Sequence, residues 1–149
     1  MEIRNKVIAI TGSGQGLGRQ FAIDCALKGA RLALLDLNYD KVKKVAGECI
    51  ELGAEANYYR MDVTSENDVK ECYEQIVKDF GSIHASINNA GILRDGLLIK
   101  EKNGEISTFP LRKWQEVIDT NLTGVFLCGR EAAFNMVKLK IRGVIINIS

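Results

Sequence analysis

The stretch KVIAITGSGQGLG, residues 6–18, decides the fold class. Its first half, Lys6–Ile10, predicts a continuous apolar strand of the kind that is covered on both faces in a parallel sheet. Its second half is rich in glycine, and Gly12, Gly16 and Gly18 fit the pattern T-G-x-x-x-G-x-G, whereas the strict G-x-G-x-x-G spacing fails. Such glycines permit a tight turn and close approach of the backbone to a pyrophosphate at the start of a helix. A merely flexible strand–helix turn is the alternative.

Beyond this turn, β-branched runs alternate with helical patterns, which is typical of βαβ units around a parallel sheet. The expected helices cover 17–28, 39–52, a segment from a cap at Thr64 or Ser65 to Phe80, and 111–139, and the further strands cover 31–36, 57–61, 83–88 and 144–148. Right-handed crossovers then give the strand order 3-2-1-4-5. The predicted fold class is α/β, a Rossmann-like doubly wound parallel sheet truncated after strand five.

A long polar stretch, Arg94–Pro110, interrupts this alternation. Within it, Lys102-Asn103-Gly104-Glu105 predicts a hairpin turn flanked by short extended pieces. The insertion Lys100–Phe109 borders either a substrate pocket or an oligomer contact, and both interpretations stay open. The helix that follows is interrupted at Asn121-Leu122-Thr123-Gly124. The three aromatic side chains in this helix are expected to take part in helix packing: Trp114, Phe126 and Phe134.

Composition is typical of one globular domain, because hydrophobic residues make up 46%, charged residues 26%, and the formal net charge is +1. Binding of nucleic acid would require a clustered basic face, which the interspersed charges do not provide. No apolar run is long enough to span a bilayer, and no signal-peptide pattern precedes the first strand. We therefore expect a cytoplasmic protein with neither a nucleic-acid nor a membrane partner. The cysteines lack metal-ligand and redox spacing, which predicts reduced thiols and no metal site: Cys25, Cys49, Cys72 and Cys128.

Asp36 ends the second predicted strand, about 20 residues after the glycine turn. A carboxylate at this position accepts hydrogen bonds from the adenosine ribose hydroxyls and repels a 2′-phosphate. Arg31 and Lys41 are near in sequence, but neither directly follows the strand as a 2′-phosphate clamp would. The pattern therefore favours NAD over NADP as cofactor. A helix-capping role for Asp36 is the alternative.

Four motifs resemble the short-chain dehydrogenase/reductase family in order and spacing, and together they extend over essentially the whole chain. They are Thr11–Gly18, Asp62-Val63 after strand three, Asn88-Asn89-Ala90-Gly91 after strand four, and Asn121-Leu122-Thr123-Gly124. The segment Arg94-Asp95-Gly96-Leu97-Leu98 looks most like the 3-oxoacyl-acyl-carrier-protein reductase branch of the family. The agreement in several motifs disfavours a different Rossmann-like protein, such as a methyltransferase that uses S-adenosylmethionine.

This resemblance implies the residues of a site. Asp62 would accept a hydrogen bond from the adenine amino group, and Asn89–Gly91 would lie beside the cofactor ribose. Asn121, the one catalytic residue expected in the chain, would distort its helix and hold a water molecule in a proton relay. His84 has no catalytic partner at a recognisable spacing and is expected to be structural. The residues implied to bind the cofactor are Gly12, Ser13, Gln15, Gly16, Leu17, Gly18, Asp36, Leu37, Asp62, Val63, Asn89, Ala90 and Gly91.

The resemblance also implies catalytic groups that the sequence does not contain. In the family, strand five leads into Asn-x-Ser-Ser, whose second serine is catalytic, and a Tyr-x-x-x-Lys pair follows; here Asn147-Ile148-Ser149 ends at the first serine. We therefore expect residues 1–149 to be an NAD(P)-binding Rossmann domain that lacks the C-terminal part of the family domain. The implied activity is NAD-dependent hydride transfer to or from a small carbonyl or alcohol substrate, in a homo-oligomer, with little turnover by this polypeptide alone. A non-catalytic dinucleotide-binding module is the alternative.

Overall fold

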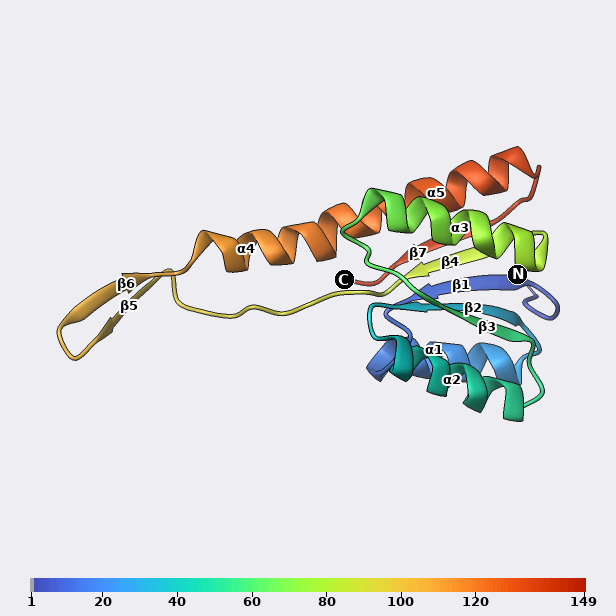
Figure 1. Cartoon of the computed structure of the whole chain (residues 1–149), viewed down its shortest axis with the longest axis horizontal. Coiled ribbons are helices and arrows are strands. Elements are labelled where there is room, and N and C mark those ends of the chain that lie inside the picture. Colours follow the sequence, from blue (N-terminus) through green and yellow to red (C-terminus); the bar gives the residue numbers. More distant parts are fainter. Residues whose placement is uncertain (1) are drawn as a thin grey trace.

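The computed structural model describes residues 2–149, and its centre is a five-stranded sheet (Figure 1). The strands are β1 (Val7–Thr11), β2 (Arg31–Asp36), β3 (Ala56–Arg60), β4 (Ala85–Asn88) and β7 (Val144–Asn147). They lie in the order β3-β2-β1-β4-β7, and every neighbouring pair is parallel. The expected Rossmann-like order 3-2-1-4-5 is confirmed, because β7 is the fifth strand of this sheet along the chain.

Helices cover both faces of the sheet. They are α1 (Gly16–Leu27), α2 (Tyr39–Glu51), α3 (Glu66–Phe80) and α5 (Gly124–Lys138). Figure 1 shows α1 and α2 on one face and α3 and α5 on the other. Successive side chains of β1 enter the two resulting cores: Ile8 and Ile10 are buried on the first face, and Val7 and Ala9 on the second. This double burial explains why β1 is apolar throughout. Within residues 2–149, no helix combines the length and apolar character needed to cross a membrane.

Side-chain caps fix where two of the helices begin. The Asn38 side chain accepts a hydrogen bond from the backbone N–H of Lys41 at the start of α2. Ser65 does the same for the N–H of Asp68 in α3, so Ser65 rather than Thr64 is the cap. The helix α3 ends at Gly81, whose φ of 75° is the left-handed conformation that glycine adopts most readily.

The helix expected over residues 111–139 consists of three elements. They are α4 (Leu111–Ile118), the π-helical turn η1 (Asp119–Thr123) and α5. The interruption therefore begins two residues before the expected position at Asn121. A single π-helical turn inserts an extra residue into an α-helix and changes the direction in which the following side chains point.

The polar insertion forms the predicted hairpin. The strands β5 (Ile99–Lys102) and β6 (Glu105–Thr108) pair in antiparallel orientation around Asn103 and Gly104, both of which have positive φ. Every residue of these two strands is exposed. Figure 1 shows that the hairpin and α4 extend away from the sheet. A two-stranded hairpin by itself is only marginally stable in water, so this segment lacks the packing that stabilises the main sheet.

The expected packing of three aromatic side chains is wrong. Trp114, Phe126 and Phe134 have exposed fractions of 51%, 61% and 59%. No residue of α4 is buried, because this helix lies beyond the end of the sheet and no element of residues 2–149 covers its apolar face.

The start of the fourth strand also differs from the prediction, since β4 begins at Ala85 rather than at residue 83. The preceding His84 has the structural role expected of it. Its Nδ1 accepts a hydrogen bond from the backbone N–H of Val7 over 3.1 Å, and burial lowers the pKa of its imidazole. All four cysteines are free thiols, as expected.

Candidate functional site

A cavity of about 650 Å³ opens at the carboxyl ends of β1, β2, β3 and β4. Open α/β sheets bind ligands in such a crevice. Of the residues predicted to bind a cofactor, those that line it are Gly12, Gln15, Gly16, Leu17, Asp36, Leu37, Asp62, Val63, Asn89, Ala90 and Gly91. Only Ser13 and Gly18 of the predicted set do not line it. The lining residues that sequence analysis did not assign are Leu35, Asn38, Lys41, Met61, Ile92 and Thr120.

The glycine turn brings the start of α1 to the cavity. Gly12 has a φ of 64°, and a Cβ there would lie 2.8 Å from Ala90 Cα, so only glycine fits. Gly16 also has a positive φ of 55°, but the space around it is open. Unlike α2 and α3, α1 has neither a side-chain cap nor an acidic residue in its first turn. Its first N–H groups are therefore available to an anion in the cavity.

The two predicted residues outside the cavity shape the turn. Ser13 is fully buried, and both its hydroxyl and its backbone N–H donate to Leu35 O. Gly18 lies in α1 where the helix meets the turn, and a Cβ there would lie 2.6 Å from Asn89 Nδ2 and closer still to Gly12 O. Sequence spacing alone could not separate these packing positions from residues that line the cavity.

Asp36 is held at the end of β2 by two backbone donors. Its Oδ2 accepts from Gly14 N over 2.8 Å and its Oδ1 accepts from Asn38 N over 2.9 Å. A Cβ on Gly14 would lie 2.9 Å from the same Oδ2, so this glycine is required for the approach of the carboxylate. Asp36 thus has a fixed orientation at the cavity and is not the cap of α2, a role that Asn38 takes.

The motif after β4 is tied to the glycine turn through Thr11. The Thr11 hydroxyl accepts from the backbone N–H groups of Asn89 and Ala90, each over 3.0 Å. The Asn89 side chain donates to the carbonyl oxygens of Thr11 and Gly12. Asn89 therefore uses its amide nitrogen to join two strand ends. Thr11, which sequence analysis treated only as part of the turn, is the residue that connects the two motifs.

Asp62 stabilises the connection that follows β3. Its Oδ1 accepts hydrogen bonds from both the backbone N–H and the hydroxyl of Thr64. The next residue, Val63, packs against the start of α5, where a Cβ on Gly124 would lie 2.8 Å from Val63 Cγ2. Gly124, the last residue of the fourth motif, is therefore needed for close packing of α5 on the segment that lines the cavity.

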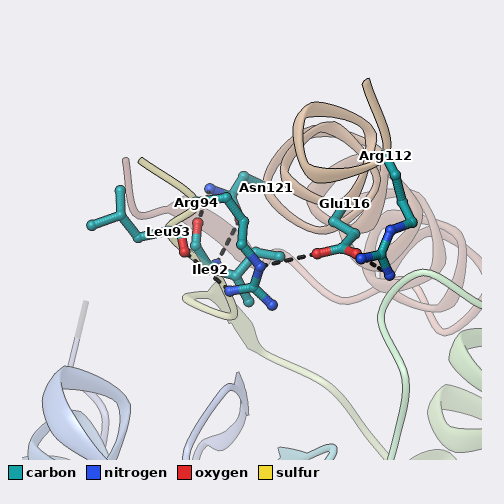
Figure 2. Close-up of polar contacts among 6 residues, drawn as sticks. All are labelled: Ile92, Leu93, Arg94, Arg112, Glu116 and Asn121. Carbon is teal, nitrogen blue, oxygen red and sulfur yellow. Dashed lines mark hydrogen bonds and ion pairs between the residues drawn. The ribbon is translucent and has the colours of Figure 1, made fainter. Parts of the chain in front are cut away.

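Asn121 clamps the segment after β4, as Figure 2 shows. Its Oδ1 accepts from Ile92 N over 2.8 Å and its Nδ2 donates to Ile92 O over 2.9 Å. Two residues further on, Arg94 forms an ion pair with Glu116 of α4 at 2.9 Å. Asn121 itself does not line the cavity, although its neighbour Thr120 does. The helix is distorted around Asn121, as expected. Both polar groups of the Asn121 side chain hydrogen-bond the backbone of Ile92.

One Tyr-x-x-x-Lys spacing occurs in the chain, at Tyr39 and Lys43 of α2, and it does not form a catalytic pair. Neither residue lines the cavity. The Tyr39 ring packs edge-on against Tyr58, with centroids 5.4 Å apart. Interaction with the Tyr58 hydroxyl raises the pKa of Tyr39, the opposite of what an activated tyrosine needs.

The sheet order, together with a glycine-rich first turn at the carboxyl edge, defines a protein of the Rossmann-like α/β class. Within this class, the chain belongs to the short-chain dehydrogenase family, whose family model matches residues 6–149.

Comparison with curated proteins finds 36% identity over 149 residues to the 3-oxoacyl-acyl-carrier-protein reductase FabG of Staphylococcus epidermidis, covering 97% of this chain and 56% of the relative. The corresponding protein of Staphylococcus aureus is 35% identical over 148 residues, covering 97% and 55%. The chain thus spans little more than half the length of these relatives.

Two solved structures have the same fold. A short-chain type dehydrogenase/reductase from Mycobacterium marinum is 32% identical with a TM-score of 0.85, over 97% of this chain and 55% of that chain. NAD⁺-bound xylitol dehydrogenase is 31% identical with a TM-score of 0.83, over 97% and 53%.

Proposed function

We propose that this protein is an NAD-dependent oxidoreductase and that its dinucleotide binds in the cavity at the carboxyl ends of β1–β4. The observation that carries the proposal is that the uncapped start of α1 and Asp36 border one cavity. Unpaired N–H groups at a helix start attract a pyrophosphate, and a carboxylate at the next strand end suits ribose hydroxyls. A dinucleotide carries both groups. Family membership and the similarity to an NAD⁺-bound dehydrogenase support this choice of ligand.

Different residues of the cavity would bind different parts of the cofactor, as the family resemblance implies. The turn Gly12–Gly16 would hold the pyrophosphate, Asp36 and Asp62 would bind the adenosine, and Asn89–Gly91 would lie beside the cofactor ribose. The nicotinamide supplies or accepts the hydride when it is bound. Ser13 and Gly18 contribute through the shape of the turn.

NAD is the preferred cofactor in this proposal because Asp36 is already oriented by Gly14 and Asn38. Each carboxylate oxygen has a second lone pair with which to accept from a ribose hydroxyl. A 2′-phosphate would place negative charge beside this carboxylate, and the repulsion would lower the affinity of the cavity for NADP.

The substrate is a small carbonyl compound or alcohol, and the two reductases that the chain resembles support a 3-oxoacyl carbonyl group. Asn121 contributes to the proton relay through its backbone. Both Oδ1 and Nδ2 of its side chain hydrogen-bond the backbone of Ile92, and we assign the relay water to the Asn121 carbonyl in the π-helical turn.

Residues 1–149 alone should show little turnover, because the family's catalytic serine and Tyr-x-x-x-Lys pair are not among them. General acid–base catalysis contributes about 10²–10⁴-fold to such reactions. Steady NADH oxidation with a 3-oxoacyl thioester, by pure protein of this length, would contradict this expectation of little turnover.

Self-association also follows from the exposed apolar side chains of α4 and α5. Leu111, Trp114, Phe126 and Phe134 are all more than half exposed. Where exposed apolar side chains form one patch, that patch is typical of an interaction surface. We propose a homo-oligomer, and sedimentation that shows a monomer at every concentration would refute it.

Calorimetric titration with NADH tests the cofactor proposal, using two glycine variants. Gly16 and Gly53 both have positive φ and open surroundings, but only Gly16 lines the cavity. Gly16→Leu and Gly53→Leu should each lose a similar 1–2 kcal/mol of stability. Gly16→Leu should abolish NADH binding while Gly53→Leu retains it. No binding by the unmodified chain, or equal binding by the two variants, would overturn the proposal.

A further inference from the structure

Residues 92–98, which belong to no helix or strand, lead from the motif after β4 to the hairpin. Every second residue of this segment contacts the chain that returns from the hairpin. The three contacts are Ile92 with Asn121, Arg94 with Glu116, and Gly96 with Phe109. The intervening Leu93 and Leu97 are exposed. Because alternate residues of an extended chain lie on the same side, one side of the segment faces the returning chain.

The two ends of this segment lie in different parts of the molecule. At the inner end, Ile92 lines the cavity, as does Thr120 in the π-helical turn. At the outer end, the Phe109 ring packs on Gly96, where a Cβ would lie 2.6 Å from Phe109 Cδ2. The ion pair between Arg94 and Glu116 lies between these two contacts, so it is the middle connection between the cavity and the hairpin.

Glu116 has two arginine neighbours, which Figure 2 shows. Its Oε2 accepts from Arg94 Nε over 2.9 Å, while its Oε1 lies 3.5 Å from Arg112 Nη1, one turn earlier in α4. Arg94 Nη1 also donates to Leu93 O over 3.0 Å. The closer of the two ion pairs thus joins α4 to the segment that leads to the cavity, whereas the longer one stays within α4.

The π-helical turn helps both polar side chains of the helix to reach this segment. Glu116 and Asn121 are five positions apart, and in a continuous α-helix such residues point about 140° apart. The turn that begins at Asp119 inserts an extra residue, which reduces this angle. Glu116 and Asn121 consequently contact residues only two positions apart, Arg94 and Ile92.

We propose that Arg94 and Glu116 are positioning residues of the cavity, because their ion pair holds residues 92–94 against α4 and keeps Ile92 in the wall. This inference rests on the proposed function for the ligand of the cavity. Neither residue lines the cavity, so both act through Ile92. Without the ion pair, Ile92 is held by the Asn121 side chain alone, and a larger fraction of the folded chain has a displaced wall. A ligand that requires the intact wall loses affinity in proportion.

The test is to measure the dissociation constant of NADH and the exchange rate of the Ile92 amide in the full chain and its variants. Arg94→Gln and Glu116→Gln should each weaken NADH about two- to fivefold, the range expected for a partly exposed ion pair, and accelerate exchange at Ile92 by a similar factor. Arg112→Gln is the matched control, because it removes the other partner of Glu116 without touching the segment, and it should change neither quantity.

Exchanging the two charges separates pairing from packing. Arg94→Glu and Glu116→Arg should each weaken NADH, since each places like charges together, and the double variant should recover most of the loss. Salt gives a second readout, because raising ionic strength from about 0.05 to about 0.5 M screens an exposed ion pair. The ratio of dissociation constants between Arg94→Gln and the unmodified chain should then fall toward one.

Each other result overturns a specific claim. If Arg94→Gln changes neither quantity, the ion pair positions nothing and the inference is wrong. If exchange at Ile92 accelerates while NADH affinity is unchanged, or if the double variant recovers nothing, the residues are only structural, and the inference fails while the proposed function stands. If the unmodified chain does not bind NADH, both fail.

Discussion

Gly18→Ala should destabilise the protein, although alanine favours helix and the position lies inside α1. A Cβ at Gly18 would overlap Gly12 O and lie 2.8 Å from Gly12 C, both of which are backbone atoms and cannot rotate away. Overpacking of this kind costs about 1–3 kcal/mol. The Cβ would also displace Asn89 Nδ2 from its bonds to Thr11 O and Gly12 O, each worth about 1 kcal/mol. The gain in helix propensity offsets about 1 kcal/mol.

The net loss is therefore about 2–4 kcal/mol in the free energy of unfolding. For a chain of this length it corresponds to a decrease in Tm of about 5–15 °C. Urea unfolding followed by circular dichroism measures the loss, with an unchanged m-value if the variant still unfolds in two states.

Gly47→Ala is the matched control for this substitution. Gly47 lies inside α2, and a Cβ there would meet nothing within 4 Å. This variant should be stabilised by about 0.5–1 kcal/mol, since alanine restricts the unfolded chain and favours helix. The two substitutions should thus have opposite signs. A Gly18→Ala variant as stable as Gly47→Ala would refute the close approach of α1 to the glycine turn.

Three further changes test other contacts. Tyr73→Phe removes a buried hydroxyl that is hydrogen-bonded inside the core and should cost about 1 kcal/mol in urea unfolding; no change would mean that the bond is absent. Asn121→Ala releases both backbone groups of Ile92, so exchange of the Ile92 amide should accelerate by about tenfold or more. Glu55→Gln tests pH dependence: Arg31 lowers the pKa of Glu55, so the ion pair stabilises the protein above the ordinary glutamate pKa and is lost as pH falls through the lowered value. Between about pH 6 and pH 3 the unmodified chain should therefore lose slightly more stability than the variant, by less than about 1 kcal/mol for this exposed pair.

The sheet could be predicted because its signals are local. The apolar run of β1 indicates a strand that is buried on both faces of the sheet. Gly81 and Gly104 both adopt positive φ, and they lie at the end of a helix and in a hairpin turn, respectively. The exposure of α4 could not be predicted in the same way. The spacing of Leu111 and Trp114 indicates an apolar face, but whether an element of the chain covers that face depends on where the helix lies relative to the sheet.

Much of the candidate site could be located from its motifs, whereas the functions of individual side chains could not. Thr11 accepts hydrogen bonds from residues 78 and 79 positions away, and no local pattern encodes that distance. Ser13 lies among the lining residues in sequence but points into the core. Lys41 reaches the cavity because α2 packs against Gly14, a contact that exists only after the sheet has formed.

The same limitation applies to a chain of polar side chains between α3 and the end of β7, which is buried except at the exposed Asn147. Tyr73 hydrogen-bonds Ser86, Ser86 donates to Asn88, and Asn88 donates to Asn147, over 2.8, 2.9 and 2.8 Å. Burial raises the pKa of Tyr73 far above its ordinary value, so the phenol stays protonated. Because each member has a partner, these groups avoid the cost of unsatisfied polar atoms in the core. They also orient Asn88, the first residue of the motif that borders the cavity, and Asn147, the last residue of β7. These hydrogen bonds therefore link the core at Tyr73 to Asn88, the residue before the cavity-lining Asn89, and Tyr73→Phe should weaken the hydrogen bonding of the Asn88 side chain.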